Sequence, residues 1–70
     1  MTPDEIGNII RIARKAQGLR QDELAGAANV GVRFLIELEA GKKTAQLGKT
    51  LSVLTALGID ISMTAPDGTI

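Results

Sequence analysis

The sequence predicts a single domain built from helices, and three observations support this fold class. Apolar residues recur at three- and four-residue spacing in four stretches, and these stretches begin and end at residues typical of helix ends. Only one short stretch alternates like a strand. A chain of 70 residues lies at the lower end of what buries a self-sufficient core. Such a small domain without covalent staples often gains stability by forming an oligomer.

The first helix is expected from Pro3 to Gln17. Thr2 can cap its start, Pro3 suits its first turn, and Gly18 favours its end. One apolar stripe runs along this helix, formed by Ile6, Ile9, Ile10, Ala13 and Ala16. Ile12 lies off the stripe, which leaves open whether it is simply exposed or contacts a partner.

Two shorter helices are expected next, from Gln21 to Ala28 and from Gly31 to Ala40. Asn29 tolerates the left-handed conformation that ends a helix, and Gly41 favours the end of the later one. A short connector and facing apolar residues make this pair a helix-turn-helix arrangement, although any compact helical hairpin shares part of the pattern. The facing residues are Leu24, Ala25, Ala28, Val30, Leu35 and Leu38.

A fourth helix is expected from Ala45 to Leu57. Thr44 can cap its start and Gly58 favours its end. Four leucines follow helical spacing and are expected on one stripe, namely Leu47, Leu51, Leu54 and Leu57.

A strand is expected over residues 59–64, because Ile59, Ile61 and Met63 alternate with polar residues. The chain offers no second strand, so the backbone groups of this one need a partner from outside, most simply a second copy of the chain. These elements divide the chain into a helix-turn-helix domain (1–58), a dimerisation strand (59–64) and a flexible tail (65–70).

The composition argues against several functions. Without cysteine or histidine, disulfides, the usual zinc sites and the usual catalytic triads are excluded. The carboxylates form no paired arrangement, and the glycine-containing stretch "GAANVG" lacks the phosphate-loop pattern. We therefore expect neither catalysis nor a metal or cofactor. No apolar run is long enough for a membrane span and no signal peptide is recognisable, so a cytoplasmic protein is expected.

The charges are separated along the chain although the formal net charge is zero. All eight basic residues lie between Arg11 and Lys49, and this stretch carries only four acidic residues, while the other four lie in the flanks. A basic centre is compatible with binding nucleic acid, and an ordinary solvated surface is the alternative.

Two overlapping stretches resemble a known family. "GLRQDELAGAANVGVRFLIELEAGK" resembles the helix-turn-helix of the XRE/Cro/phage-repressor family, and "VGVRFLIELEAGKKTAQLGKTLSVLTALGIDI" is similar to HipB-type antitoxins, including their Y4mF-like relatives. The resemblance implies a compact four- to five-helix, lambda-repressor-like domain whose short C-terminal β-strand pairs across a homodimer. It also implies a repressor of its own operon that binds double-stranded DNA and pairs with a HipA-type kinase toxin.

The sequence departs from the family pattern at three helix ends. Arg20 replaces the usual Thr or Ser cap of the second helix, and Gly31 replaces the usual cap of the third. Asn29 stands where glycine is usual, which left-handed geometry allows. Each weakened cap costs about 1 kcal/mol, which loosens the motif without abolishing it.

The third helix, projected at 100° per residue, turns Leu35 and Leu38 inward. The residues on its outward face are expected to read bases: Val32, Arg33, Ile36 and Glu37. Arg33 suits a bidentate contact to guanine, and Val32 suits a thymine methyl group. Glu37 can accept from a cytosine amino group or orient Arg33. The alternative is a solvated Arg33–Glu37 pair of little energetic weight.

Other residues are assigned to the DNA backbone or to support. The resemblance implies that Gln21 holds a phosphate or orients a base-reading side chain, with an ordinary exposed amide as the alternative. Positive charge in range of phosphates is provided by Arg20, Lys42, Lys43 and Lys49. The resemblance further implies a partly buried salt bridge between Arg14 and Glu39. Phe34 lies at the edge of the buried arc, which favours packing over contact with DNA.

The sequence thus predicts a dimeric, sequence-specific transcriptional repressor that binds a palindromic operator, in the role of an antitoxin of a HipBA-like operon. Two alternatives remain open at this stage. One is a phage-type repressor without a toxin, and the other is a protein-interaction module of the same fold that has lost DNA reading, which the zero net charge would suit.

Overall fold

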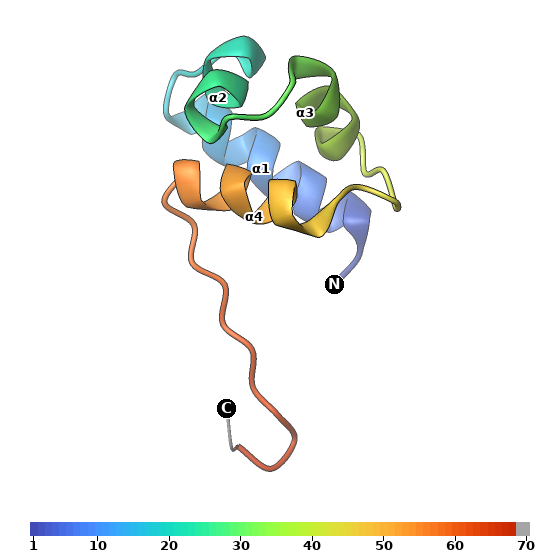
Figure 1. The fold of residues 1–70 in the computed structure, drawn as a ribbon. Coiled ribbons are helices and arrows are strands. Elements are labelled where there is room, and N and C mark those ends of the chain that lie inside the picture. The colour runs from blue at the N-terminus through green and yellow to red at the C-terminus, as the bar shows by residue number, and fades with distance from the viewer. Residues whose placement is uncertain (69–70) are drawn as a thin grey trace.

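The computed structural model describes residues 1–68, which contain four helices and no strand. The helices are α1 (Pro3–Ala16), α2 (Gln21–Ala28), α3 (Val32–Glu39) and α4 (Leu47–Ala56). Figure 1 shows α2 and α3 side by side above α1 and α4, with the C-terminal segment extending away below. The prediction of an all-α, helix-turn-helix domain is confirmed for this part of the chain.

The ends of α1 follow from the residues that flank it. The hydroxyl of Thr2 accepts a hydrogen bond from the backbone N–H of Glu5 at 3.2 Å, which satisfies one of the free donors of the first turn. Pro3 occupies the first turn, and Gln17 caps the C-terminus one residue earlier than expected. Gly18 follows with a φ of +70°, a conformation that favours glycine.

The turn between α2 and α3 has the geometry that the sequence predicts. Asn29 adopts the left-handed conformation, with φ 57° and ψ 44°, and ends α2. At the start of α2, the Glu23 carboxylate accepts a hydrogen bond from the backbone N–H of Arg20 at 2.8 Å, which partly replaces the missing Ser or Thr cap. Gly31 gives α3 no side-chain cap. Helix α3 is one residue shorter than predicted at each end.

The core lies where the four helices meet. Ile10 of α1, Leu24 of α2, Leu35 of α3 and Val53 of α4 are fully buried, so every helix contributes at least one side chain. The remaining buried apolar residues are Ala25, Ala28, Leu38, Leu54 and Leu57. These include the residues predicted to join α2 and α3, with Val30 partly buried against the cluster.

Two predictions for the fourth helix are wrong. It starts at Leu47 with Gln46 at the cap position, so Thr44 does not cap it. The predicted leucine stripe is also divided, because the side of α4 that packs on the core carries Thr50, Val53, Leu54 and Leu57. Leu47 and Leu51 remain 71% and 43% exposed. The inward face is therefore rotated from the all-leucine stripe, with Thr50 tolerated inside because its hydroxyl donates to the Gln46 carbonyl at 2.9 Å.

The segment predicted as a strand is not one within the described chain. Residues 59–65 carry no regular hydrogen-bonding pattern, and only Ile59 of the three alternating apolar residues packs against the core. A strand needs a partner edge, which this single chain does not supply. A turn follows, closed by a 2.9 Å hydrogen bond from the Gly68 N–H to the Ala65 carbonyl. The last two residues of the predicted flexible tail lie outside the described residues.

No helix in residues 1–68 combines the length and apolar character that crossing a lipid bilayer requires.

Candidate nucleic-acid interface

Helix α3 is held close to α1 by a glycine. An added Cβ at Gly7 would lie 2.5 Å from the Leu38 carbonyl oxygen and 2.7 Å from that of Glu39. The backbone of α1 therefore approaches the C-terminal turn of α3 more closely than any other residue would allow. This contact fixes the angle at which α3 leaves the core.

A buried ion pair fixes the same end of α3. The guanidinium of Arg14 donates to the Glu39 carboxylate at 2.7 Å from Nε and 3.1 Å from Nη2, and the two side chains are only 10% and 4% exposed. Arg14 Nη1 also donates to the Leu19 carbonyl at 2.8 Å. The hydrogen bonds that Arg14 donates to Glu39 raise the pKa of the Arg14 guanidinium, so Arg14 stays charged. This is the salt bridge that the family resemblance implied.

Gln21 joins that network at the start of α2. Its side-chain amide donates to Glu39 Oε1 at 3.2 Å, so Glu39 accepts from residues of both α1 and α2. The Gln21 side chain is half-buried rather than freely exposed. Its carbonyl oxygen has no partner within residues 1–68 and remains available as an acceptor at the edge of α3.

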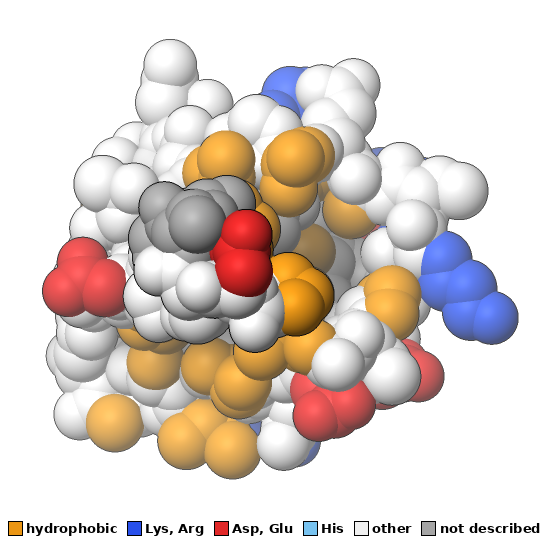
Figure 2. All heavy atoms as spheres, turned by 90° about the horizontal axis from the view of Figure 1, so that it is seen from below, with side chains coloured by type: hydrophobic (Ala, Val, Ile, Leu, Met, Phe, Trp, Pro, Cys, Tyr) orange, Lys and Arg blue, Asp and Glu red, His pale blue; other side chains and the backbone are white. Residues whose placement is uncertain are grey.

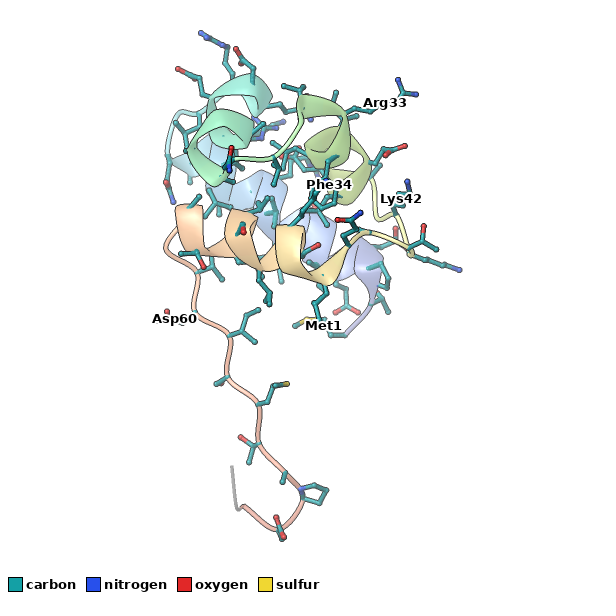
Figure 3. The ribbon with its side chains drawn as sticks, in the orientation of Figure 1. Met1, Arg33, Phe34, Lys42 and Asp60 are labelled. Carbon is teal, nitrogen blue, oxygen red and sulfur yellow. The ribbon has the colours of Figure 1, made fainter. Side chains whose placement is uncertain are left out.

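The outward face of α3 carries one free cation between two aliphatic side chains. Arg33 is exposed and has no hydrogen-bond or ion-pair partner among the described residues, and Figure 3 shows it pointing away from the helical body. Val32 and Ile36 beside it are 41% and 46% exposed. An arginine without a partner retains all its donors for a ligand.

Glu37, the fourth residue of this face, pairs with a different residue from the one that the sequence suggested. Its carboxylate accepts from Lys42 Nζ at 3.2 Å, and no Arg33–Glu37 ion pair occurs. The solvated Arg33–Glu37 pair, which was the alternative to base reading, is therefore absent, and so is the suggested orientation of Arg33 by Glu37. The charges of Glu37 and Lys42 therefore neutralise each other, one helical turn after the exposed Arg33.

A comparison with protein-family models matches residues 10–63 to the family described as helix-turn-helix. The match covers more than half of the chain and includes all of α2 and α3. The chain belongs to the helix-turn-helix family. A relative with a curated description is the uncharacterized HTH-type transcriptional regulator y4mF of Sinorhizobium fredii (strain NBRC 101917 / NGR234). It is 62% identical over 65 residues, which cover 93% of this chain and 86% of the relative.

In this helix-turn-helix unit, the basic side chains assigned to the DNA backbone differ in what they contact. Lys43 is exposed and has no partner within residues 1–68, whereas Lys42 is engaged by Glu37. Arg20 lies 3.0 Å from Asp22, and its hydrogen bond lowers the pKa of that carboxyl. Lys49 Nζ lies 5.6 Å from the centre of the Phe34 ring, within the range of a cation–π contact.

Phe34 of α3 lies next to α4, as its contact with Lys49 indicates. The ring packs against the core as a partly buried residue, between α3 and α4, as Figure 3 illustrates. Ile12, whose role the sequence left open, is an exposed residue of α1.

The contacts that Arg20, Lys42 and Lys49 make with other side chains were not predicted from the sequence. Asp22 is only two residues from Arg20, so that pair was visible from proximity alone. Lys42 lies beyond the end of α3, and Lys49 belongs to another helix than Phe34. Helical spacing gives no signal for either of these two contacts.

No group of three or more acidic side chains close enough to hold a metal ion occurs in residues 1–68. The distinctive features of the unit are a rigidly held short helix, an unpaired arginine on its outer face, and further cations around it.

Proposed function

We propose that this protein is a sequence-specific DNA-binding transcriptional repressor. The observation that carries the proposal is the outward face of α3, where Arg33 is exposed and unpaired on a helix fixed from behind by the Arg14–Glu39 pair. A helix-turn-helix unit presents the N-terminal part of its second helix to the major groove. The name of the 62% identical relative, an HTH-type transcriptional regulator, supports the same function.

Each outward residue has a base feature that suits it. Arg33 is assigned to guanine O6 and N7, because a guanidinium can donate to both at once. Val32 and Ile36 suit thymine methyl groups. Glu37 accepts from a cytosine amino group once Lys42 turns from it to a phosphate, since both residues are exposed enough to separate at little cost.

The backbone contacts are assigned by charge and geometry. Lys43 is free to approach a phosphate, and Lys42 is released by the exchange just described. Arg20 pairs with the exposed Asp22, and Lys49 has only the weak contact to the Phe34 ring, so a phosphate can replace either partner. The Gln21 amide is positioned at the edge of α3 by Glu39 and accepts or donates a further hydrogen bond there.

The proposed repressor binds a palindromic operator as a homodimer. Two copies paired through residues 59–64 would form the strand that a single chain cannot form, and would satisfy its unpaired backbone groups. The α3 helices of the two copies then contact two half-sites that lie about one DNA turn apart, or a multiple of that spacing.

The more specific role that we propose is that of an antitoxin in a HipBA-like operon. The similarity of residues 30–61 to HipB-type antitoxins supports this role. A kinase-like reading frame next to the gene, whose product co-purifies with this chain, is the expected finding. A neighbourhood without such a frame would favour the phage-type repressor without a toxin.

A gel-shift titration on the DNA upstream of the gene tests the proposal. We expect binding that weakens steeply with salt, because phosphate contacts release counterions. Arg33→Ala should weaken specific binding by about 5- to 150-fold, the equivalent of about 1–3 kcal/mol for a bidentate base contact. Arg11→Ala, which removes the same charge from α1, should change the affinity far less.

The protein-interaction alternative gives the opposite result. The exposed Val32 and Ile36 and the zero net charge are the features that favour it. Binding that is insensitive to salt and to Arg33→Ala would exclude the repressor and leave that alternative.

A further inference from the structure

The turn that ends α3 has a defined hydrogen-bonding pattern. Gly41 adopts a φ of +88°, and its N–H donates to the Leu38 carbonyl at 3.0 Å. The N–H of Lys42 donates to the Glu37 carbonyl at 3.1 Å. These two bonds form a Schellman motif, which brings the second residue after the helix cap beside the third-last residue of the helix. The backbone of the turn therefore places Lys42 next to Glu37.

The two side chains at these positions form an ion pair. A Schellman motif usually brings two apolar side chains together here, whereas Lys42 Nζ donates to the Glu37 carboxylate at 3.2 Å. The turn is held from α1, because the Asp4 carboxylate packs directly against Gly41 and leaves no room for a Cβ. The ion pair therefore belongs to a fixed turn, although its side chains are 47% and 41% exposed.

Glu37 has a second cation within reach on its own helix. Arg33 precedes it by four residues, and side chains at that spacing are neighbours on a helix surface and attract each other when oppositely charged. Nevertheless, Arg33 has no hydrogen-bond or ion-pair partner among the described residues, because Lys42 engages the carboxylate. Figure 3 shows Arg33 directed away from the helical body and Lys42 in the loop that follows α3.

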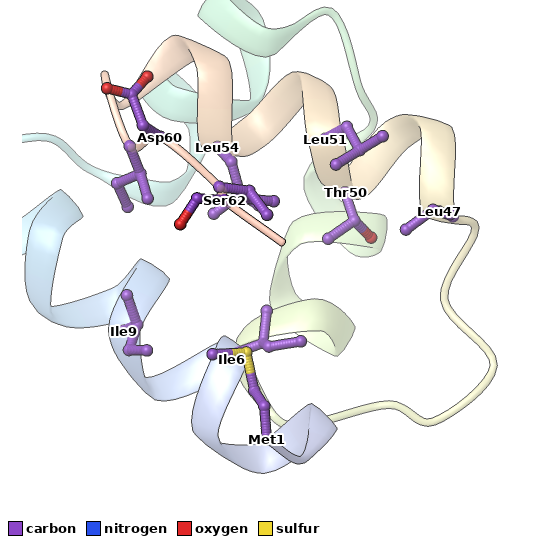
Figure 4. A pocket seen from close by; sticks show the side chains of 11 residues that line it. Met1, Ile6, Ile9, Leu47, Thr50, Leu51, Leu54, Asp60 and Ser62 are labelled. Atoms are coloured by element: carbon purple, nitrogen blue, oxygen red, sulfur yellow. The ribbon is translucent and has the colours of Figure 1, made fainter. Parts of the chain in front are cut away.

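Other carboxylates of the described chain have different surroundings. Asp22 and Glu39 each accept a hydrogen bond from another arginine. Asp60 lines an apolar groove between α1 and α4, shown in Figure 4, and Figure 3 places it on the opposite side of the helical body from Arg33. Figure 2 shows hydrophobic side chains gathered on the face that carries this groove. Of these carboxylates and Glu37, only Glu37 shares a helix face with Arg33.

We propose that Lys42 is a positioning residue for base reading, which holds the Glu37 carboxylate in the free protein and so keeps Arg33 unpaired for guanine. The inference rests on the proposed DNA reading and adds an order of events to it. Arg33 reaches its base while Glu37 is still held, and Lys42 turns to a phosphate once the DNA is in place. Without Lys42, the Glu37 carboxylate turns to Arg33, and DNA binding first has to break that pair.

Nuclear magnetic resonance of the arginine side chains tests this competition without DNA. The heteronuclear NOE of each Nε–H group reports its mobility, and Arg14, held in its buried ion pair, gives the value of a fixed guanidinium. We expect a low value for Arg33 in the natural chain and in Lys43→Met, and a rise towards the Arg14 value in Lys42→Met. Adding Glu37→Gln to Lys42→Met should return Arg33 to the low value. An Arg33 value that does not rise in Lys42→Met would overturn the proposal.

Operator affinity measures the consequence for DNA binding. Lys42→Met and Lys43→Met each remove one charge from the same loop, so both should lose a similar phosphate contact. Lys42→Met should lose about 1.4- to 2.3-fold more, the equivalent of about 0.2–0.5 kcal/mol for an ion pair at this helical spacing. Glu37→Gln should recover this extra loss in Lys42→Met, beyond any change that it causes in Lys43→Met.

The remaining outcomes separate this inference from the proposed function. Lys42→Arg, which keeps a cation at the turn, should behave like the natural chain in both measurements. Equal losses in the two lysine-to-methionine variants, or equal recovery by Glu37→Gln in both, would overturn the positioning role. If Arg33 becomes fixed in Lys42→Met but the natural chain binds no operator, the repressor is refuted and the competition for Glu37 stands.

Discussion

At the scale of single residues, the Glu39 carboxylate connects three segments of the chain. It accepts from Arg14 of α1 and Gln21 of α2, although it belongs to α3. Because the Glu39 side chain is almost fully buried, its charge is compensated only by these donors. The orientation of the outward face of α3 therefore depends on a charge buried behind that face.

Glu39→Ala should be strongly destabilising. Removing the carboxylate leaves the buried guanidinium of Arg14 with only the Leu19 carbonyl, and breaking a buried pair typically costs about 3–5 kcal/mol. Urea denaturation measures the loss of unfolding free energy. A double variant, Arg14→Met with Glu39→Leu, should lose much less, since no unpaired charge remains. A loss below about 0.5 kcal/mol for Glu39→Ala would contradict this account.

The sequence alone revealed some of these residue contacts and not others. Arg14 and Glu39 are 25 residues apart, so no local spacing links them, and it was the family resemblance that implied their pairing. The exposure of Arg33 followed from helical phase alone. The Glu37–Lys42 pair did not, because it crosses the end of α3, where the helical projection no longer applies.

At the scale of helices, two glycines have opposite roles. Gly7 of α1 is required by the carbonyls of α3, whereas Gly26 of α2 has open space around its Cβ position. A glycine inside a helix is unfavourable unless packing demands it. Packing requires glycine at position 7 but not at position 26.

Alanine at these two positions should therefore shift stability in opposite directions. Gly7→Ala forces α1 and α3 apart and should destabilise the protein by about 1–3 kcal/mol, the usual cost of overpacking. Gly26→Ala should stabilise it by about 0.4–1 kcal/mol through helix propensity. Thermal unfolding of both variants measures the difference. If Gly7→Ala is as stable as Gly26→Ala, the close approach of α1 and α3 is wrong.

The helices themselves were predictable, and the face that one of them turns inward was not. Residues such as Thr2, Asn29 and Gly18 mark helix ends through local hydrogen bonds and backbone preference, which a sequence displays directly. The inward face of α4 depends instead on how α4 meets α2. The four leucines could not reveal it, because Thr50 and Val53 occupy inward positions that two of the leucines were expected to fill.

At the scale of the whole molecule, the chain consists of a folded helical core and a C-terminal segment that extends away from it. Removing residues 61–70 keeps Ile59, which packs against the core, and should leave a folded monomer. Operator binding should weaken, because one recognition helix then binds where two acted together. Molar mass, circular dichroism and a gel shift measure the three effects. A truncated chain that remains a dimer would refute the proposed strand pairing.

The proposed function has two copies of the chain contact guanine in the major groove through Arg33. Dimethyl sulfate footprinting of the upstream DNA tests it most directly, because this reagent methylates guanine N7, the atom assigned to Arg33. We expect protected guanines in two half-sites about 34–36 Å apart or a multiple of that spacing, with protection lost in Arg33→Ala but not in Arg11→Ala. Bound DNA in which no guanine N7 is protected, or protection that survives Arg33→Ala, would contradict it.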